Sequence, residues 1–241
     1  MKNVCILILF YLLVVSCKEE VKTNQDYDTS IEVRDPEPIK KENKQKIRTT
    51  AGAIAFANGL SHWDKVKQIS FTFNVDQDST HYERTWSWRP KSEMITMMSS
   101  EDTITYNRKN IDSISIQADK GFINDKYWLL APFNLVWDET SFTSKHQIKA
   151  VAPISKNEMQ KLTIVYNNSG GYTPGDAYDF YFNGDFKIKE WVFRKANTKE
   201  PSLITSWEDY ENFDGITIAK THHKEEGNWK LYFTNIKIET D

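Results

Sequence analysis

The feature that most constrains the fold is an alternation of apolar and polar residues with period two, which recurs from residue 69 onward. Ile69, Phe71, Phe73 and Val75 alternate with polar residues in the first run. Successive side chains of a strand point to opposite faces, so each such run predicts a half-buried strand. Further runs of this kind lie at 81–88, 93–98, 103–107, 145–151, 160–167, 176–182, 187–194, 203–210, 216–222 and 229–238.

Turn sequences between these runs predict antiparallel pairing. Asn183-Gly184-Asp185 joins the runs 176–182 and 187–194, and Asn-Gly favours a type I′ turn. Asp214-Gly215 and Gly227-Asn228 separate the last strands. A sheet of about ten strands must curl or close. We therefore predict a mostly β fold, a single curved antiparallel sheet that forms an open half-barrel of about ten strands.

Two segments depart from the strand pattern. Residues 47–60, IRTTAGAIAFANGL, predict an N-terminal helix with Thr49 or Thr50 as N-cap and Gly59 near its end. Residues 121–138, GFINDKYWLLAPFNLVWD, concentrate large apolar side chains around a central proline. That composition is typical of a core segment, a membrane-contacting segment or the wall of an apolar site.

The N-terminus predicts an exported protein. Lys2 precedes an apolar run, Val4 to Val15, that is too short to span a bilayer as a helix, which is typical of a secretory signal peptide. Residues 14–17, Val-Val-Ser-Cys, resemble a bacterial lipobox. The resemblance implies cleavage after residue 16 and lipidation of Cys17. The alternatives are an ordinary signal peptide and a buried helix that carries a cysteine by chance.

Residues 17–46 are expected to be the lipidated cysteine followed by a flexible charged tether, because they contain too few apolar groups to offset the entropy of ordering. Residues 47–241 then form one domain. Lys18-Glu19-Glu20 resembles the export signal of surface lipoproteins in the Bacteroidota. The expected location is therefore the outer membrane, lipid-anchored and facing either the periplasm or the cell surface.

Composition argues against several classes of function. The chain carries 31 basic and 34 acidic residues, and nucleic-acid binding would need a concentrated basic face. Cys5 and Cys17 are its two cysteines, so the domain lacks thiols for a disulfide or a metal. His222 and His223 are adjacent on a strand and point to opposite faces. We expect a monomer with no cofactor, no metal site and no nucleic-acid partner.

Catalytic patterns are scarce. Glu190, Glu208, Asp209 and Glu211 could include a pair of carboxylates for glycoside hydrolysis. Solvent-facing charges that alternate with core residues explain the same spacing without catalysis, and we favour that interpretation. The chain contains no GxSxG or SxxK motif. We therefore expect a protein that is not an enzyme.

Aromatic residues give the stronger signal. Tyr178, Phe180 and Phe182 share one face of a strand, Trp191 and Phe193 lie together on the next, and Trp86 and Trp88 lie on an earlier one. Aromatic side chains that several strands turn inward must either pack on a plug or line a cavity.

Three further motifs carry a family resemblance: INDKYWLLAPF (123–133), YTPGDAYDFYF (172–182) and SWEDYENFDGITIA (206–219). Together with WSWRP at 86–90, they resemble the motifs of an uncharacterised family of Bacteroidota lipoproteins, similar in fold to the LolA/LolB lipoprotein carriers. The resemblance covers roughly residues 50–240. It implies an open half-barrel whose concave face is closed by helices over an apolar cavity.

On this basis residues 121–138 are expected to form a helical plug on the concave face, with Pro132 ending a short helical turn. The candidate ligand-lining residues are Trp86, Trp88, Tyr127, Trp128, Leu129, Phe133, Tyr178, Phe180, Phe182, Trp191 and Phe193. The expected function is binding of an acyl chain or other apolar ligand by a carrier, chaperone or sensor. A structural or interaction lipoprotein with a filled barrel is the alternative, and a glycan or lipid hydrolase is a third.

Overall fold

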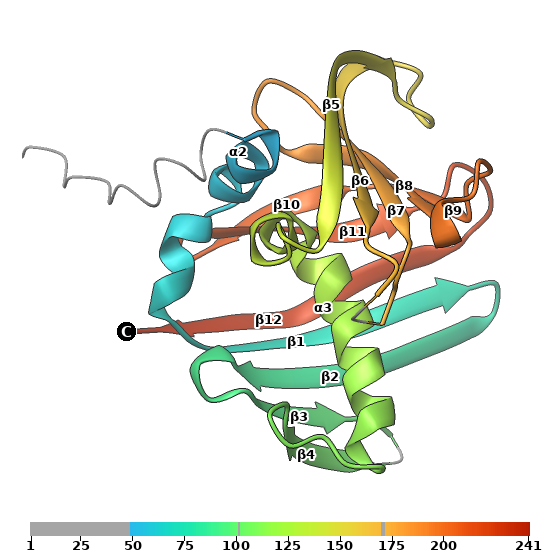
Figure 1. The fold of residues 1–241 in the computed structure, drawn as a ribbon. Helices are drawn as coiled ribbons and strands as arrows, with labels where there is room; N and C mark the ends of the chain where they lie inside the picture. Colours follow the sequence, from blue (N-terminus) through green and yellow to red (C-terminus); the bar gives the residue numbers. More distant parts are fainter. Residues whose placement is uncertain (1–48, 101, 170–171) are drawn as a thin grey trace, which may run out of the picture. The chain divides into compact units, whose positions relative to one another are not determined.

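The computed structural model describes residues 49–100, 102–169 and 172–241. The expected signal peptide, Cys17 and the tether lie outside these residues. In the described part, two antiparallel sheets are accompanied by the helices α2 and α3 (Figure 1).

The larger sheet has seven strands in the order β10-β11-β12-β1-β2-β3-β4. The first strand of the domain pairs with the last, and Ile69 of β1 lies opposite Ile238 of β12. A 3₁₀ turn, η2 (Pro90–Ser92), connects β2 to β3. The strands are β1 Val66–Gln77, β2 Thr80–Arg89, β3 Met94–Met98, β4 Thr103–Asn107, β10 Glu208–Phe213, β11 Ile216–His223 and β12 Lys230–Thr240.

The smaller sheet has five strands in chain order, β5-β6-β7-β8-β9. β5 is mostly exposed along its length, and the β5–β6 hairpin projects at the top of Figure 1. The 3₁₀ turn η3 (Lys195–Asn197) follows β8. The strands are β5 Phe142–Val151, β6 Glu158–Tyr166, β7 Ala177–Phe182, β8 Ile188–Arg194 and β9 Leu203–Ser206.

The predicted mostly β, antiparallel fold is confirmed, but the prediction of a single sheet of about ten strands is wrong. The run 203–210 is split at Trp207, so that β9 belongs to the smaller sheet and β10 to the larger. The backbone N–H of Trp207 still bonds Lys189 O of β8 at 2.8 Å, and Asp209 then adopts a φ of 54°. This local change of direction carries the chain from one sheet to the other.

Helix α2 (Thr50–Ala57) confirms the predicted N-terminal helix. Thr49 is the N-cap, and its Oγ1 accepts a hydrogen bond from Gly52 N at 2.9 Å. Gly59, with a φ of 96°, ends the segment and leads into the 3₁₀ helix η1 (Leu60–Lys65). A Cβ at Gly59 would lie 1.9 Å from the carbonyl oxygen of Gly215, so the close approach of these two backbones requires glycine.

Helix α3 (Ser115–Trp137) is much longer than the expected helical turn, and Pro132 lies inside it instead of ending it. Proline lacks an N–H, and its ring conflicts with the carbonyl four residues earlier, so a helix that continues through it must bend. The bend lies at Leu130, whose φ and ψ are −125° and 27°. At the start of α3, Asp112 Oδ1 accepts hydrogen bonds from Ser115 N at 2.7 Å and from Ser115 Oγ at 2.6 Å.

The hairpin at Asn183–Asp185 exists, but its turn is not of type I′. β8 begins only at Ile188, and the residue with positive φ is Phe186 (55°). The Phe186 ring stacks on that of Phe182, with centroids 5.7 Å apart. This contact accounts for a longer loop, because it buries an aromatic ring that a two-residue turn would expose. Asp214 and Gly215, with φ of 48° and 88°, do form a two-residue turn between β10 and β11.

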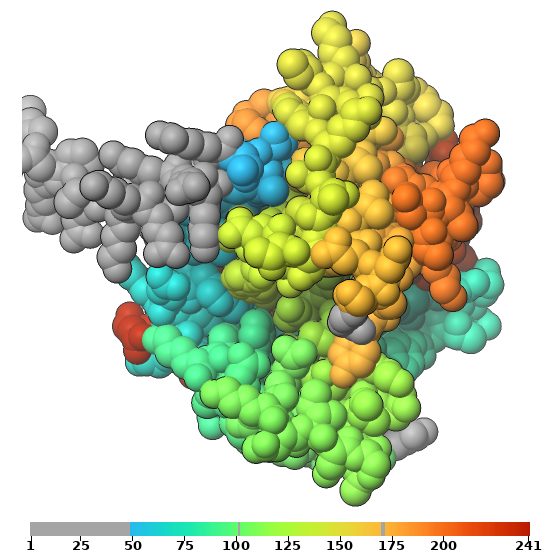
Figure 2. Space-filling view, in the orientation of Figure 1, coloured from blue at the N-terminus to red at the C-terminus, as the bar shows by residue number. Residues whose placement is uncertain are grey.

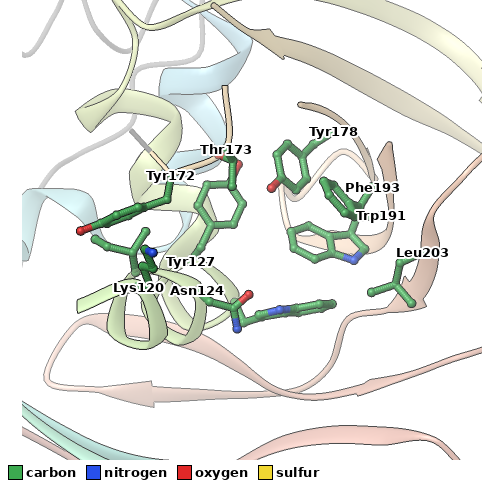
Figure 3. A pocket seen from close by; sticks show the side chains of 11 residues that line it. Lys120, Asn124, Tyr127, Tyr172, Thr173, Tyr178, Trp191, Phe193 and Leu203 are labelled. Atoms are coloured by element: carbon green, nitrogen blue, oxygen red, sulfur yellow. The ribbon is translucent and has the colours of Figure 1, made fainter. Parts of the chain in front are cut away.

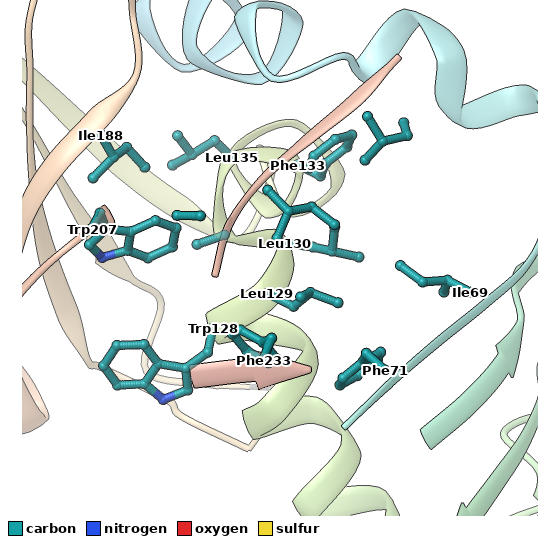
Figure 4. Packing of buried hydrophobic residues seen from close by; sticks show 14 of the residues in the cluster. Ile69, Phe71, Trp128, Leu129, Leu130, Phe133, Leu135, Ile188, Trp207 and Phe233 are labelled. Atoms are coloured by element: carbon teal, nitrogen blue, oxygen red, sulfur yellow. The ribbon is translucent and has the colours of Figure 1, made fainter. Parts of the chain in front are cut away.

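The main hydrophobic core lies between α3 and the two sheets. In Figure 4, side chains of α3 lie between Ile69 and Phe71 of β1 on one side and Ile188 and Trp207 on the other. Leu129, Leu130 and Phe133 of α3 are almost fully buried there. The bent helix is thus an integral part of the core. Within the described ranges, no helix is both long and apolar enough to cross a membrane.

Candidate ligand site

A cavity of about 410 Å³, here called the apolar cavity, lies between α3, the strands β7 to β9 and the loop before β7. Figure 3 shows Asn124 and Tyr127 of α3 facing Tyr178, Trp191 and Phe193 of the strands. The volume falls within the range of small-molecule sites, roughly 300–1,000 Å³. Its lining residues are Lys120, Ile123, Asn124, Tyr127, Trp128, Tyr172, Thr173, Tyr178, Trp191, Phe193 and Leu203.

Helical and strand periodicity explain why these side chains converge. Lys120, Ile123, Asn124 and Tyr127 follow the spacing i, i+3, i+4, i+7, which places them on one face of α3. On the opposite wall, Tyr178 of β7 pairs with Phe193 of β8. The wall is therefore built on regular elements rather than on loops alone.

Contacts between aromatic rings hold the wall together. The ring centroids of Trp128 and Trp191 are 4.2 Å apart, those of Tyr127 and Tyr178 4.9 Å, and those of Tyr178 and Phe193 5.1 Å. Such pairs contribute about 0.5–1.5 kcal/mol each beyond their buried area. Trp128 and Trp191 are 8% and 2% exposed, so this part of the wall is almost fully removed from solvent.

A second cavity of about 300 Å³, here called the polar cavity, adjoins the first. The two share Ile123, Tyr127, Tyr172 and Thr173, so these residues separate an apolar compartment from a polar one. The remaining lining residues of the polar cavity are Arg108, Lys126, Asn134, Asp138, Ser141, Tyr166, Asn167 and Ser169.

Lys126 is the most unusual charge in the polar cavity. Its Nζ donates to Asn134 Oδ1 at 3.1 Å and lies 5.2 Å from the ring centroid of Trp137. In a straight helix, residues eight positions apart are separated by about 12 Å along the axis. The bend at Leu130 lies between Lys126 and Asn134, and their side chains meet across it. Burial lowers the pKa of the Lys126 ammonium to about 8, although the negative charge of Asp138 acts in the opposite direction.

Two tyrosine hydroxyls and one carboxylate also line the polar cavity. The Tyr166 hydroxyl donates to Asp138 Oδ2 at 3.1 Å and lies 3.3 Å from the Tyr127 hydroxyl. Burial raises the pKa of both tyrosines well above the usual value, so both stay protonated at physiological pH.

The loop before β7 is fastened to α3 over both cavities. The Tyr172 hydroxyl donates to Asp119 Oδ2 at 2.8 Å, and Asp119 is fully buried. Asp119 Oδ1 accepts further bonds from Arg108 Nε at 2.8 Å and Tyr106 OH at 3.1 Å. In Figure 2 the segment ahead of β7, in orange, lies against the green α3.

The structure divides the predicted lining residues into two groups. Tyr127, Trp128, Tyr178, Trp191 and Phe193 line the apolar cavity. Trp86, Trp88, Leu129, Phe133, Phe180 and Phe182 are buried in the core and are not among the residues that line either cavity.

Trp86 and Trp88 illustrate the reason for this division. Both lie on β2 and pack against Phe122 of α3, with ring centroids 5.4 Å away in each case. Trp86 Nε1 also donates to Asp125 Oδ2 at 2.8 Å, and both carboxylate oxygens of Asp125 bind Arg84. These rings therefore fix α3 to the larger sheet, away from the cavity.

Several lining residues were not predicted, notably Ile123, Tyr172 and Leu203 in the apolar cavity and Asn134 in the polar one. The spacing of residues 120, 123, 124 and 127 would have identified one wall if the helix had been placed from residue 115. Tyr172 and Leu203 carry no such periodic signal, because they come from a loop and the first position of a short strand.

The candidate carboxylates have structural partners. Glu190 is 4% exposed, and its two oxygens accept bonds from Ile154 N at 2.7 Å and Ser155 N at 2.9 Å. Asp209 Oδ2 accepts from Thr221 Oγ1 at 2.8 Å. No group of three or more potential metal ligands occurs among the residues that the structure describes.

Comparison with known proteins gives structural neighbours only. No family model matches the chain, and no curated protein matches it significantly. A LolA superfamily protein from Nitrosomonas europaea is similar over 80% of this chain and 95% of its own, with 11% identity and a TM-score of 0.48.

Two further solved structures are similar at the same level. A DUF1329 family protein from Desulfovibrio piger matches 81% of this chain and 92% of its own, with 9% identity and a TM-score of 0.46. An outer membrane lipoprotein-sorting protein domain from Vibrio parahaemolyticus matches 83% and 90%, with 10% identity and a TM-score of 0.43. The LolA superfamily, to which the sequence motifs pointed, is thus among the structural neighbours of the chain, and these similarities assign it no ligand.

Proposed function

We propose that this protein is a non-catalytic envelope lipoprotein that binds an acyl chain or a similar apolar ligand in the apolar cavity. The observation that carries the proposal is the cavity itself, about 410 Å³ of space with an aromatic wall. Removal of apolar surface from water contributes about 25 cal/mol per Å², so a hydrocarbon chain in this space would bind through burial alone.

Contacts among the aromatic rings of the wall support a cavity that binds a ligand, rather than one that closes by repacking of its side chains. Trp128 and Trp191 contact each other, and Trp191 also contacts Trp207 with centroids 5.3 Å apart. Because these rings are supported by their neighbours, we expect the wall to resist collapse into the cavity. A preformed cavity costs little reorganisation when a ligand enters.

The proposal includes lipidation at Cys17 and anchoring in the outer membrane, with the domain facing the periplasm or the cell surface. It rests on the lipobox-like end of the leader segment. A tethered domain that holds acyl chains could act as a carrier, a chaperone or a sensor of lipids.

A structural or interaction lipoprotein remains a second candidate, and one observation favours it. Six of the predicted lining residues fill the core rather than a cavity, and they include the fully buried Trp86 and Phe180. A protein whose interior serves only for packing would show the same arrangement in that region.

A cavity-filling substitution separates these two functions. Leu203 of β9 lines the apolar cavity, whereas its neighbour Ile204 packs on the other side of the strand against a separate small cluster. We expect Leu203→Trp to weaken binding of a fluorescent fatty acid by at least about tenfold, and Ile204→Trp to leave it unchanged. Native mass spectrometry of the purified wild-type protein would identify co-purifying lipids. Equal binding by both variants, or none by the wild type, would support the filled-core alternative.

A further inference from the structure

The polar cavity offers hydrogen-bond donors that the protein leaves without acceptors. Asn134 is 1% exposed, and its Nδ2 has no hydrogen-bond partner within the described part of the chain. A buried amide without a hydrogen-bond partner destabilises the folded protein, so such a group commonly marks the place where a partner binds. Asn134 lines the polar cavity next to Lys126, whose ammonium carries three donors.

Lys126 is also a partly buried cation, and it forms no ion pair within residues 49–100, 102–169 and 172–241. Its ammonium donates to the amide oxygen of Asn134, which carries no charge. Trp88 and Trp137 face its ammonium at 5.9 and 5.2 Å. Loss of water lowers its pKa, and the nearby negative charge of Asp138 offsets this effect only in part.

The other charges near this cavity are already partnered. Arg108 binds Asp119 through Nε at 2.8 Å and lies 3.9 Å from Glu93. Asp138 accepts the hydroxyl of Tyr166. Among the described residues, Lys126 is therefore the cation of this cavity without a carboxylate in ion-pair contact, and it is the group that can pair with an anionic ligand, while the carboxylate of Asp138 opposes such a ligand.

We propose, building on the proposed function, that the ligand is a single-chain amphiphile with an anionic head. Its chain lies in the apolar cavity, and its carboxylate or phosphate enters the polar cavity to accept hydrogen bonds from Lys126 Nζ and Asn134 Nδ2. In this arrangement the ligand crosses from one compartment to the other beside the shared residues Ile123, Tyr127, Tyr172 and Thr173, where the two cavities adjoin.

This arrangement explains the pairing of two unlike cavities. A carboxylate or phosphate supplies both the missing counter-charge and acceptors for several donors, and charge-assisted hydrogen bonds are stronger than neutral ones. A neutral amphiphile of the same length would bury the same chain but would leave the ammonium unpaired. The polar cavity thereby selects among amphiphiles by their head group.

Three ligands with one chain length test the inference with the purified full-length protein: dodecanoate, dodecyl phosphate and dodecanol. We expect wild type to bind at least one of the two anions about tenfold or more tightly than the alcohol, as measured by displacement of a fluorescent fatty acid. Whichever anion binds more tightly identifies the head group as carboxylate or phosphate.

Two variants in the polar cavity give opposite shifts. Lys126→Met keeps the unbranched stem of the side chain and removes its ammonium, so binding of the preferred anion should fall by at least about 30-fold while dodecanol changes less than about threefold. Asp138→Asn removes the carboxylate of the same cavity and should tighten the anion. Lys145→Met, an exposed lysine on β5, is the control and should change neither ligand.

The outcomes separate this inference from the proposed function. If wild type binds none of the three ligands, the proposed function itself is refuted. If it binds all three equally, or if Lys126→Met weakens anion and alcohol alike, the anionic head group is refuted while binding of chains stands. If Lys120→Met at the apolar cavity, rather than Lys126→Met, weakens the anion, the head group lies outside the polar cavity and the inference fails.

Discussion

His222 should make the stability of the domain depend on pH in a predictable direction. The side chain is 0% exposed and packs among Trp207, Trp128 and Phe233, with ring centroids at 4.6, 5.1 and 6.1 Å. Its Nδ1 lies 3.1 Å from Ser206 O, and since a carbonyl can only accept, Nδ1 carries the proton. Burial lowers the pKa of His222 to about 3, so the folded protein keeps this imidazole neutral down to acidic pH.

The sign and size of the effect follow from proton linkage. In the unfolded chain a histidine has a pKa of about 6.5, so between the two pKa values the unfolded state binds a proton that the folded state does not. Stability from this group is therefore present above pH 6.5 and is lost as the pH falls toward 3. Between about pH 7 and about pH 5 the unfolded imidazole becomes almost fully protonated, which lowers the free energy of unfolding by about 2 kcal/mol.

Urea unfolding followed by tryptophan fluorescence at about pH 7 and about pH 5 measures this loss. The informative quantity is the difference between the two pH values, so a general loss of stability in a variant cancels. We expect His222→Asn to abolish about 2 kcal/mol of the difference. His223→Asn, which removes the neighbouring imidazole on the opposite face, shows how much belongs to the rest of the chain.

The exposed His81 changes the pH dependence of stability in the opposite direction, and it does so in wild type and in both variants. The hydrogen bond from His81 to Asp76 raises the pKa of His81, which favours the folded state at lower pH. This contribution is common to wild type and both variants and does not affect the comparison. If His222→Asn loses as much stability on acidification as wild type, His222 is not the buried neutral group described here.

Three further predictions concern the backbone, the anchor and the cavity wall. Gly59→Ala should lower the free energy of unfolding by more than about 1 kcal/mol, because of its positive φ and the contact with Gly215, whereas Gly184→Ala, with open space around it, should be nearly neutral in the same denaturation assay. Cys17→Ser should release the folded protein from the membrane fraction, and retention despite cleavage of the signal peptide would contradict lipidation. Trp128→Ala should cost less than the roughly 3–5 kcal/mol of a fully packed aromatic ring while altering fatty-acid uptake, and a full loss without any binding would favour a filled core.

Much of the strand content could be predicted from the sequence, but the division into two sheets could not. Alternation identifies which side of a strand is buried, and it located the runs around Ile69 and Tyr178. It contains no information on where a chain leaves one sheet for another. That step depends on Trp207. Its backbone N–H bonds the carbonyl of Lys189 in β8 of the smaller sheet, and the next residues form β10 of the larger sheet.

The candidate site shows the same limit. Inward-facing aromatics were recognisable, yet Trp88 and Trp191 have the same sequence signature, and only the position of α3 makes one a core residue and the other a wall residue. The polar cavity joins Lys126 and Asn134 with Tyr166, which is far away in the chain. The sequence predicts that Pro132 ends a helical turn, so Lys126 and Asn134 were not expected to lie on one helix. A packed interior can tolerate a bent helix that continues through proline, and the sequence rule does not include this case.

Because of the bend at Leu130, the two halves of α3 have different neighbours and should tolerate different substitutions. Before the bend, Ile123 and Tyr127 face the cavities, so substitutions there can retune what the protein accepts. After the bend, Phe133 and Leu135 are locked between the sheets, where changes threaten folding itself. Homologues that have adapted to different ligands should therefore diverge at the cavity-lining positions of the first half and at Asn134, and stay nearly uniform at the core positions after the bend.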